Sequence, residues 1–446
     1  MNRGFHTSHK LALLTGIGVL ALGLGGQSAQ AQLFCPSGGT FSNGSCVNAA
    51  GTEGAVSTAA LSSQALSDAS QNVTQVSNDQ ATSAVRRRLD QERAAPTVAP
   101  VAAPAPARRR AAAPVSRDLK DGPMVVKAPP PVVSYGPTFA MWAHGYGDYE
   151  KWNSDTTGIR RPGGALLLLA NNDPTNISLE RRTTTFGVLG GADWTFNSAT
   201  STWIMGVLAG YMDSTVKFHS TSAGTPAGIA TGNSTISDVK ADITGPSIGG
   251  YITFATGPWS FDVTGRVDFL SIDQSFNELL FANTAAAVNT SGSASTDVNN
   301  YSVTANANYR IPSSASTWWE PTVGFRYTRS DYDNSAAVLG MADGEVWRVQ
   351  GGVRFGADMI WGGTQVVATL TGLAYSDVSI SGLVLNSGSF GGAVVPDDEG
   401  KVRGMGILGL NFIYSPAVTT YLNAEVRGGD DYFGVGGRIG LRVALN

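Results

Sequence analysis

The chain has 446 residues, of which 55 are Gly and only 14% are charged, and its formal net charge is -4. A helical or α/β enzyme normally has more charged residues and less Gly, so the composition favours β structure. Nucleic-acid binding would need a denser basic face than this chain offers.

The first residues predict a secretion signal that covers residues 1–31. A basic start that includes Lys10 precedes an apolar run beginning at Leu11, and the pattern Ala-Gln-Ala follows, ending at Ala31. A transmembrane anchor is the alternative, but the apolar run is short for a bilayer span. We therefore expect export, with cleavage after Ala31.

Residues 32–95 form a low-complexity segment rich in Ser, Ala and Gln, and it begins with the only two cysteines, Cys35 and Cys46. In an exported protein such a close pair predicts a small disulfide loop. A metal site is the alternative, but two thiols with no neighbouring His make a poor one.

The later part of this segment has a thin apolar stripe at Ala59, Leu66, Val73 and Val76. That spacing suits a weakly amphipathic helix. Disorder is the other interpretation, because so little apolar surface does not offset the entropy of ordering.

Residues 96–134 form a linker rich in Pro, Ala and Arg, which predicts an extended spacer and no helix directly before the next segment. We expect the triplets Arg86 to Arg88 and Arg108 to Arg110 to be solvated. The alternative is that they contact anionic lipid head groups or a cell-wall polymer such as peptidoglycan.

Residues 135–446 contain twelve strand candidates of about ten residues each, the length of a tilted strand that crosses a bilayer. They lie near residues 138–150, 183–196, 202–213, 246–255, 259–270, 298–311, 317–328, 346–359, 364–376, 402–414, 419–427 and 432–445. In "WSFDVTGRVDFLS", residues 259–271, apolar residues and Gly alternate with a second set that includes Asp262, Arg266 and Asp268. One face of such a strand suits lipid and the other suits water.

The links between these strands alternate in length. Five outer links, 151–182, 214–245, 271–297, 329–345 and 377–401, are long and polar, and only the last, "GGDD", is short. The inner links "NSATS", "GP", "PSSAS", "IWGG" and "SPAV" are all tight turns. A soluble β-sandwich has no reason to keep this rhythm, but an outer-membrane barrel has long outer loops and short periplasmic turns. Aromatic residues expected to form an interfacial girdle lie at strand ends: Trp194, Phe196, Trp203, Trp259, Trp318, Trp319, Trp347 and Tyr414.

The sequence therefore predicts an all-β membrane protein, an antiparallel outer-membrane barrel of about twelve strands that follows a largely disordered N-terminal region. The alternation places fifteen charged residues on the wet inner face. They are Asp193, Asp262, Arg266, Asp268, Arg310, Glu320, Arg326, Arg348, Arg354, Asp358, Arg403, Glu425, Arg427, Arg438 and Arg442. Such charges can pair with one another, with water, or with a segment threaded through the bore. A sharper alternative makes the arginines an electrostatic guide for an anion or a passing chain.

Four strands resemble those of the autotransporter β-domain family. The first strand, "FAMWAHGYGDYEKW", the second, "TTTFGVLGGADWTF", the third, "WIMGVLAGYMDSTV", and the last, "DYFGVGGRIGLRV", carry the resemblance, which covers Thr138 to Asn446. The resemblance implies a monomeric twelve-stranded barrel in the outer-membrane lipid of a Gram-negative bacterium, inserted by the barrel assembly machinery. It also implies an N-terminal passenger displayed at the cell surface.

Catalytic motifs are missing from the sequence, which has no H-E-x-x-H, G-x-S-x-G or P-loop. His144 is the single candidate for a site at the rim, because Asp148 and Glu150 follow it on the same strand phase. A structural hydrogen-bonding role is the more common use of such a His. We expect no cofactor, no metal and no enzymatic activity.

Two functions remain. The chain is either an autotransporter-type barrel that anchors and displays its short N-terminal region, or a passive porin-like pore whose N-terminal region stays in the periplasm. A contact with a surface ligand through the outer link that contains Leu166 to Leu169 is a further alternative.

Overall fold

The computed structural model describes residues 40–42, 45–47, 58–93, 138–157, 159–160, 166–167, 175–198, 200–224, 234–281, 288–339, 341–384 and 399–445. The predicted signal, residues 1–31, and the linker, residues 96–134, lie outside these ranges. Cys35 does as well, so the disulfide with Cys46 stays a prediction.

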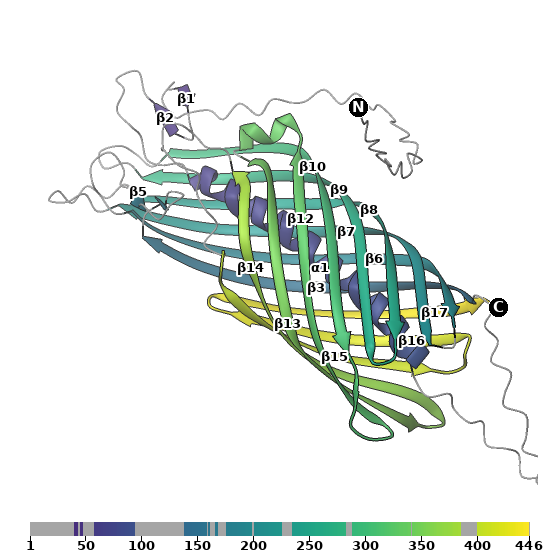
Figure 1. Cartoon of the computed structure of the whole chain (residues 1–446). Helices are drawn as coiled ribbons and strands as arrows, with labels where there is room; N and C mark the ends of the chain where they lie inside the picture. The colour runs from purple at the N-terminus through teal and green to yellow at the C-terminus, as the bar shows by residue number, and fades with distance from the viewer. Residues whose placement is uncertain are drawn as a thin grey trace, which may run out of the picture.

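Twelve antiparallel strands close into a barrel, which confirms the predicted fold (Figure 1). The strands are β3 (Thr138–Thr157), β6 (Thr175–Asn197), β7 (Ser201–Gly224), β8 (Ser234–Thr256), β9 (Trp259–Phe281), β10 (Val288–Tyr309), β12 (Thr317–Tyr332), β13 (Met341–Trp361), β14 (Thr364–Val384), β15 (Val402–Ile413), β16 (Val418–Gly429) and β17 (Tyr432–Leu445). The last strand pairs with the first, with Leu445 opposite Phe139. Closure leaves no sheet edge among these strands, as a bilayer requires.

Several smaller elements are not counted among these twelve strands. They are the hairpin of β1 (Thr40–Ser42) and β2 (Ser45–Val47), the hairpin of β4 (Ile159–Arg160) and β5 (Leu166–Leu167), the short β11 (Ile311–Pro312), which pairs with β12, and a 3₁₀ helix, η2 (Asn334–Leu339). At the turn end of the barrel, Gly257, Gly362 and Gly363 have positive φ, which makes very short turns possible.

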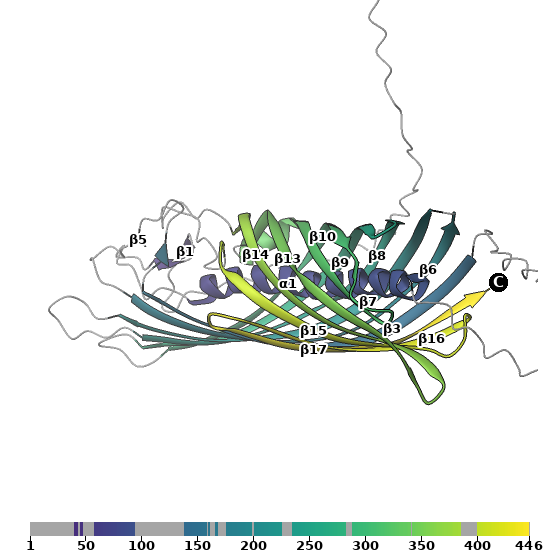
Figure 2. The ribbon, with the colours of Figure 1, turned by 60° about the horizontal axis from the view of Figure 1, so that its bottom comes forward.

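The barrel wall is much taller on one side than on the other. Strands β6–β10 have 23, 24, 23, 23 and 22 residues, whereas β15–β17 have 12, 12 and 14. About ten residues suffice to cross hydrocarbon at this tilt. The surplus of β6–β10 runs past the ends of the short strands, on the side of the longer links (Figures 1 and 2).

The outer face of the wall is apolar only within a band. On β9, Phe261, Val263 and Phe269 face outward and are exposed. Beyond Phe269 the pattern reverses, because Leu270 and Ile272 are buried inside and the outward positions become polar.

This reversal corrects the predicted links. Residues 175–182, 214–224, 234–245, 271–281 and 288–297 belong to strands and not to loops. The sequence interpretation was wrong there because strands with a polar outer face were taken for polar loops. The gaps between the long strands are shorter than predicted, 225–233 between β7 and β8 and 282–287 between β9 and β10.

Most of the predicted girdle aromatics face outward, including Trp194, Trp203 and Trp259. Trp318 does not. Its side chain is buried and points into the lumen, so its assignment to the girdle was wrong; Trp319, the next residue, takes the outward position.

One long helix, α1 (Thr58–Arg93), runs lengthwise inside the barrel (Figure 2). The sequence left helix and disorder open for this segment, and the structure has a helix. Of the predicted apolar stripe, Leu66, Val73 and Val76 are buried, and the side chain of Ala59 lies outside the described part of the structure. Polar residues on the other faces of the helix are buried as well. The barrel wall supplies the partners that such a helix would lack in water. Of the helices in the described ranges, none is apolar enough over its length to cross a bilayer.

Candidate functional site in the barrel lumen

The outer third of α1 is held by apolar packing. Leu66, Ala69 and Val73 join a buried cluster with Val216 on β7 and Ile272 on β9. These wall residues belong to the tall part of the wall, beyond the lipid-facing band. Apolar burial therefore fixes this end of the helix where the wall projects past the membrane.

The middle of α1 makes neutral hydrogen bonds, chiefly to β10. Asn300 Nδ2 donates to Thr74 Oγ1 at 2.8 Å, and Ser302 Oγ donates to Asn78 Oδ1 at 3.0 Å. The hydroxyls of Ser77 and Tyr146 lie 3.1 Å apart. Short polar side chains on both surfaces let the helix lie close to the wall while its buried polar groups keep partners.

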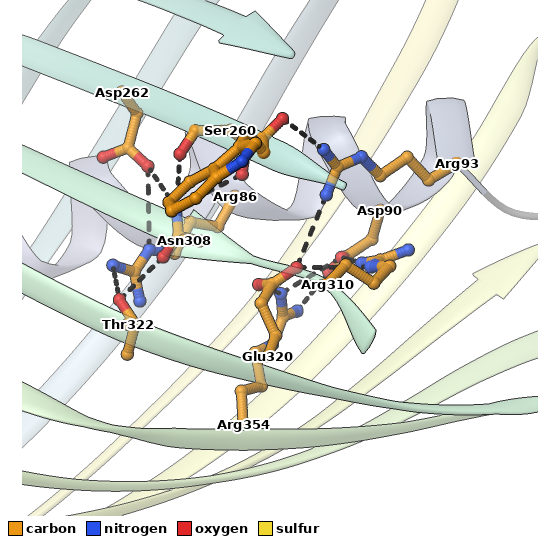
Figure 3. Close-up of polar contacts among 11 residues, drawn as sticks. Arg86, Asp90, Arg93, Ser260, Asp262, Asn308, Arg310, Glu320, Thr322 and Arg354 are labelled. Carbon is orange, nitrogen blue, oxygen red and sulfur yellow. Dashed lines mark hydrogen bonds and ion pairs between the residues drawn. The ribbon is translucent and has the colours of Figure 1, made fainter. Parts of the chain in front are cut away.

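The last turns of α1 are charged and contact three parts of the wall. Arg88 donates to Thr195 Oγ1 at 2.6 Å and to Asp193 at 3.3 Å. Arg86 donates to Thr322 Oγ1 at 3.0 Å and lies 3.8 Å from Asp262 (Figure 3). Arg87 and Arg88 are buried, so the expectation that this triplet is solvated was wrong.

Five residues form what we call the turn-side cluster: Asp90 and Arg93 of α1 with Arg310, Glu320 and Arg354 of the wall (Figure 3). The Asp90 carboxylate accepts from Arg310 at 2.7 Å and from both terminal nitrogens of Arg354, one of them at 3.1 Å. Glu320 accepts from Arg310 at 3.2 Å, from Arg354 at 3.3 Å and from Arg93 at 3.5 Å. Two carboxylates and three guanidinium groups thus share one site, in which Asp90, Glu320 and Arg354 are buried and the two other arginines are partly exposed.

Trp318 supports the two wall arginines of this cluster. The guanidinium carbon of Arg310 lies 3.7 Å from the centre of the indole, and that of Arg354 lies 5.2 Å from it. The indole can lie flat on the neighbouring strand because residue 356 is Gly; a Cβ there would be 2.0 Å from the ring. This packing holds both guanidinium groups in place by cation–π contact.

Two further wall arginines contact α1 in its middle. Arg326 forms an ion pair with Asp79 and donates to the carbonyl oxygen of Gln75 at 3.5 Å. Arg438 donates to Gln80 Oε1 at 2.7 Å. These contacts come from β12 and β17, on separate parts of the wall.

On the part of the wall formed by β3 and β13 to β17, several charges pair with one another. Arg427 of β16 contacts Asp148 and Glu150 of β3, with 2.7 Å to Glu150. Arg348 and Asp377 form a two-pronged pair at 2.7 and 2.8 Å. α1 lies instead against the strands on the other side, chiefly β7, β8 and β9. Wall side chains therefore occupy part of the bore, and α1 occupies another part.

All fifteen charges that the sequence assigns to the lumen lie on the inward side of the wall, and all but Arg310 and Asp358 are buried. Those in direct contact with α1 are Asp193, Asp262, Arg310, Glu320, Arg326, Arg354 and Arg438. The others have these neighbours in the wall: Arg266 and Asp268 pair with each other, Arg348 pairs with Asp377, Arg403 lies over Tyr432, Glu425 pairs with Arg427, Arg442 lies near Asp193, and Asp358 lies at the turn end.

Several lumen charges were missed. Arg181 and Asp377 lay in predicted links, and continued alternation beyond the assumed strand ends would have found them. The charges of α1 were missed because the segment was not placed in the lumen. The signal was the run "RRRLDQER", residues 86–93, at the end of a stretch poor in charge.

His144 has a structural environment. It is buried, and its Nδ1 lies 2.9 Å from the Tyr421 hydroxyl. Asp148 and Glu150, its proposed partners, contact Arg427 instead. Within the described ranges, no three or more His, Cys, Asp or Glu residues gather in a way that could hold a metal ion. The two carboxylates that follow His144 on its strand therefore bond to an arginine, and the hydrogen-bond partner of His144 is a tyrosine hydroxyl.

Several solved structures match the chain at low sequence identity. Solved structures that match the chain include the β-domain of the Bordetella autotransporter BrkA (14% identity, TM-score 0.44, 68% of this chain and 98% of that one). They also include the transport unit of AIDA-I from Escherichia coli (10%, 0.41, 69% and 90%) and the translocator domain of NalP from Neisseria meningitidis (14%, 0.38, 70% and 89%). No curated protein matches the chain.

The family model of the autotransporter β-domain matches residues 141–425, which is more than half of the chain. Domains of this family are translocator barrels of the outer membrane and are generally not catalytic. The chain belongs to the autotransporter β-domain family.

Proposed function

We propose that this protein is a non-enzymatic outer-membrane anchor that carries its own N-terminal segment through the barrel and displays it at the cell surface. The observation that carries the proposal is the direction in which α1 runs through the lumen. The signal predicted in residues 1–31 would export the chain, and the barrel assembly machinery would insert it as a monomer into outer-membrane lipid.

The two ends of the barrel are distinguished by their connections. Very short turns at residues 257–258 and 362–363 lie at one end, and longer links such as 158–174 and 385–401 lie at the other. In bacterial outer-membrane barrels the short turns face the periplasm and the longer loops face outward. The tall side of the wall, β6–β10, then projects from the cell surface.

α1 spans the lumen, with its first turns at the end with the longer links and its last turn at the turn end. Its last residue, Arg93, donates at 2.8 Å to the carbonyl oxygen of Trp259, next to the turn at 257–258. Near its start, Leu66 packs in the cluster that contains Met341, at the beginning of β13 on the long-link side. β3 also begins at the turn end. The connection from the end of α1 to the start of β3 therefore begins and ends on this side of the barrel. The segment ahead of Thr58 would therefore lie outside the cell.

Epitope tags on the two sides of α1 test this proposal. One tag is inserted after Gly51, ahead of the helix, and a matched tag is inserted after Ala112, behind it. Protease added to intact cells should remove the first tag and spare the second until the outer membrane is permeabilised.

Protection of the Gly51 tag in intact cells would refute display. It would favour the second function, a structural or porin-like barrel whose N-terminal region stays in the periplasm. Cleavage of both tags in intact cells would also contradict the proposal, since the linker should remain on the inner side.

A further inference from the structure

The charge on α1 is concentrated at its turn-side end. Between Thr58 and Val85 the only charged residues are Asp68 and Asp79, whereas six of the eight residues from Arg86 to Arg93 are charged. The two parts of the helix should therefore differ in how strongly they prefer one position along the bore.

Apart from the pair of Asp79 with Arg326, the middle of α1 distinguishes poorly between positions. It presents Ser, Thr and Asn to a wall strand, β10, whose inward residues are Asn300, Ser302, Thr304 and Asn306. A helix shifted by one turn could find equivalent neutral hydrogen bonds there, since hydroxyl and amide groups donate and accept. Such a surface lets a chain pass while its polar groups stay satisfied.

The turn-side cluster, in contrast, favours one position of α1 along the bore. Without α1 the wall would hold two guanidinium groups, Arg310 and Arg354, against one bonded carboxylate, Glu320. α1 adds one carboxylate, Asp90, and one guanidinium group, Arg93, so it changes how these charges are paired and not their sum. The two guanidinium groups are already positioned on Trp318. Asp90, which is 1% exposed, supplies the missing carboxylate and bonds to both of them. Placing an uncharged residue at this level would leave a buried charge uncompensated, which is strongly unfavourable.

We infer that Arg310, Arg354 and Trp318 form a carboxylate-binding site in the wall whose ligand is Asp90, and that this site stops the outward passage of the chain. It sets the final position of α1 in the bore. The residues named are positioning residues for the display function, so the inference rests on that proposal. Arg93 on Glu320 and Arg88 on Asp193 secure the same end of the helix.

Single-channel recording on the purified full-length protein in planar lipid bilayers provides the first test. Wild type should be mostly closed, because α1 fills its part of the bore. Asp90→Asn keeps the size of the side chain but leaves Arg310 and Arg354 without their carboxylate. We expect the equilibrium between open and closed states to shift toward open by about a hundredfold or more.

Asp79→Asn is the comparison variant, because Asp79 is a helix carboxylate with one arginine partner, Arg326, in the middle of the helix. Arg326 is buried, but it also bonds to Thr304 Oγ1 and to the Gln75 carbonyl oxygen, so it keeps two partners when the carboxylate is lost. We expect Asp79→Asn to shift the same equilibrium by at least about tenfold less than Asp90→Asn, which leaves two guanidinium groups without their shared carboxylate. Equal effects of the two variants, or an Asp90→Asn channel that stays as closed as wild type, would overturn the inference. If Asp90→Asn does not fold, Arg354→Gln removes the site from the wall side and should give the same opening.

The tags distinguish this inference from the proposed function. In Asp90→Asn cells, the tag after Ala112 should become accessible to external protease in a fraction of the molecules, because the chain is no longer stopped. A protected Gly51 tag in wild type would refute display, whereas the conductance result does not depend on which side that tag faces. If, in Asp90→Asn cells, the Gly51 tag is removed as in wild type but the Ala112 tag stays protected, the inference that Asp90 stops the chain is refuted. The proposal of display is not affected by that result.

Discussion

β9 has two consecutive stretches whose apolar side chains point to opposite faces of the wall. From Trp259 to Phe269 the apolar side chains point outward and Asp262, Arg266 and Asp268 point into the lumen. From Leu270 onward the apolar side chains point inward, and the outward positions carry residues such as Asp273. The strand itself continues without a break.

The surrounding medium explains the difference. In the first stretch the outside is lipid, so apolar side chains lie there and the charges are buried in the lumen. In the second stretch the outside is water, and the apolar side chains pack against α1 as they would in a soluble protein. One wall therefore follows the rules of a membrane barrel at one end and of a soluble sheet packed on a helix at the other.

The largest effect on stability should come from the inner core of the tall wall. Phe218→Ala removes a buried ring from the cluster that packs on Leu66, and we expect it to lower the free energy of unfolding by about 3–5 kcal/mol. Denaturant unfolding of the protein in lipid vesicles measures this change. A loss below about 1 kcal/mol would mean that this part of the wall does not behave like a soluble core.

The next largest effect should come from the lipid-facing band. Val263→Arg places a charge in hydrocarbon and should lower the unfolding free energy by about 2–4 kcal/mol. Ser275→Arg, on the same face of the same strand but beyond the band, is the matched control and should change it by less than about 0.5 kcal/mol. Similar losses for the two variants would mean that the lipid-facing band extends past residue 275. The two stretches of β9 would then not face different media.

The smallest effect should come from ion pairs on the outer face of the tall wall. Lys240 and Asp242 lie 2.6 Å apart, but their side chains are 51% and 41% exposed. We expect Lys240→Gln to change the unfolding free energy by less than about 1 kcal/mol, and the change should shrink further in high salt. A larger loss that is independent of salt would show that this pair is buried against another molecule.

The sequence was sufficient to predict the barrel because lipid imposes a strict alternation of apolar and polar residues on each strand. Alternation such as that of Phe261, Asp262 and Val263 can be read locally, and twelve such segments with short turns between alternate pairs define the architecture. The same pattern indicated which charges, Arg310 and Arg354 among them, belong to the inward side. The strand ends near Thr175 and Phe281 were missed, because beyond the lipid the local pattern changes sense.

The tertiary structure decided the role of residues 58–93. As a sequence, this segment is too polar to order itself, so helix and disorder were equally compatible with it. Its stability comes from partners far away in the chain: Thr74 bonds to Asn300, and Asp90 bonds to Arg310 and Arg354. The sequence by itself determined where the wall meets lipid, because burial against lipid depends on near neighbours. Which charges meet inside the bore depends on how twelve strands close around a helix, and only the folded barrel brings them together.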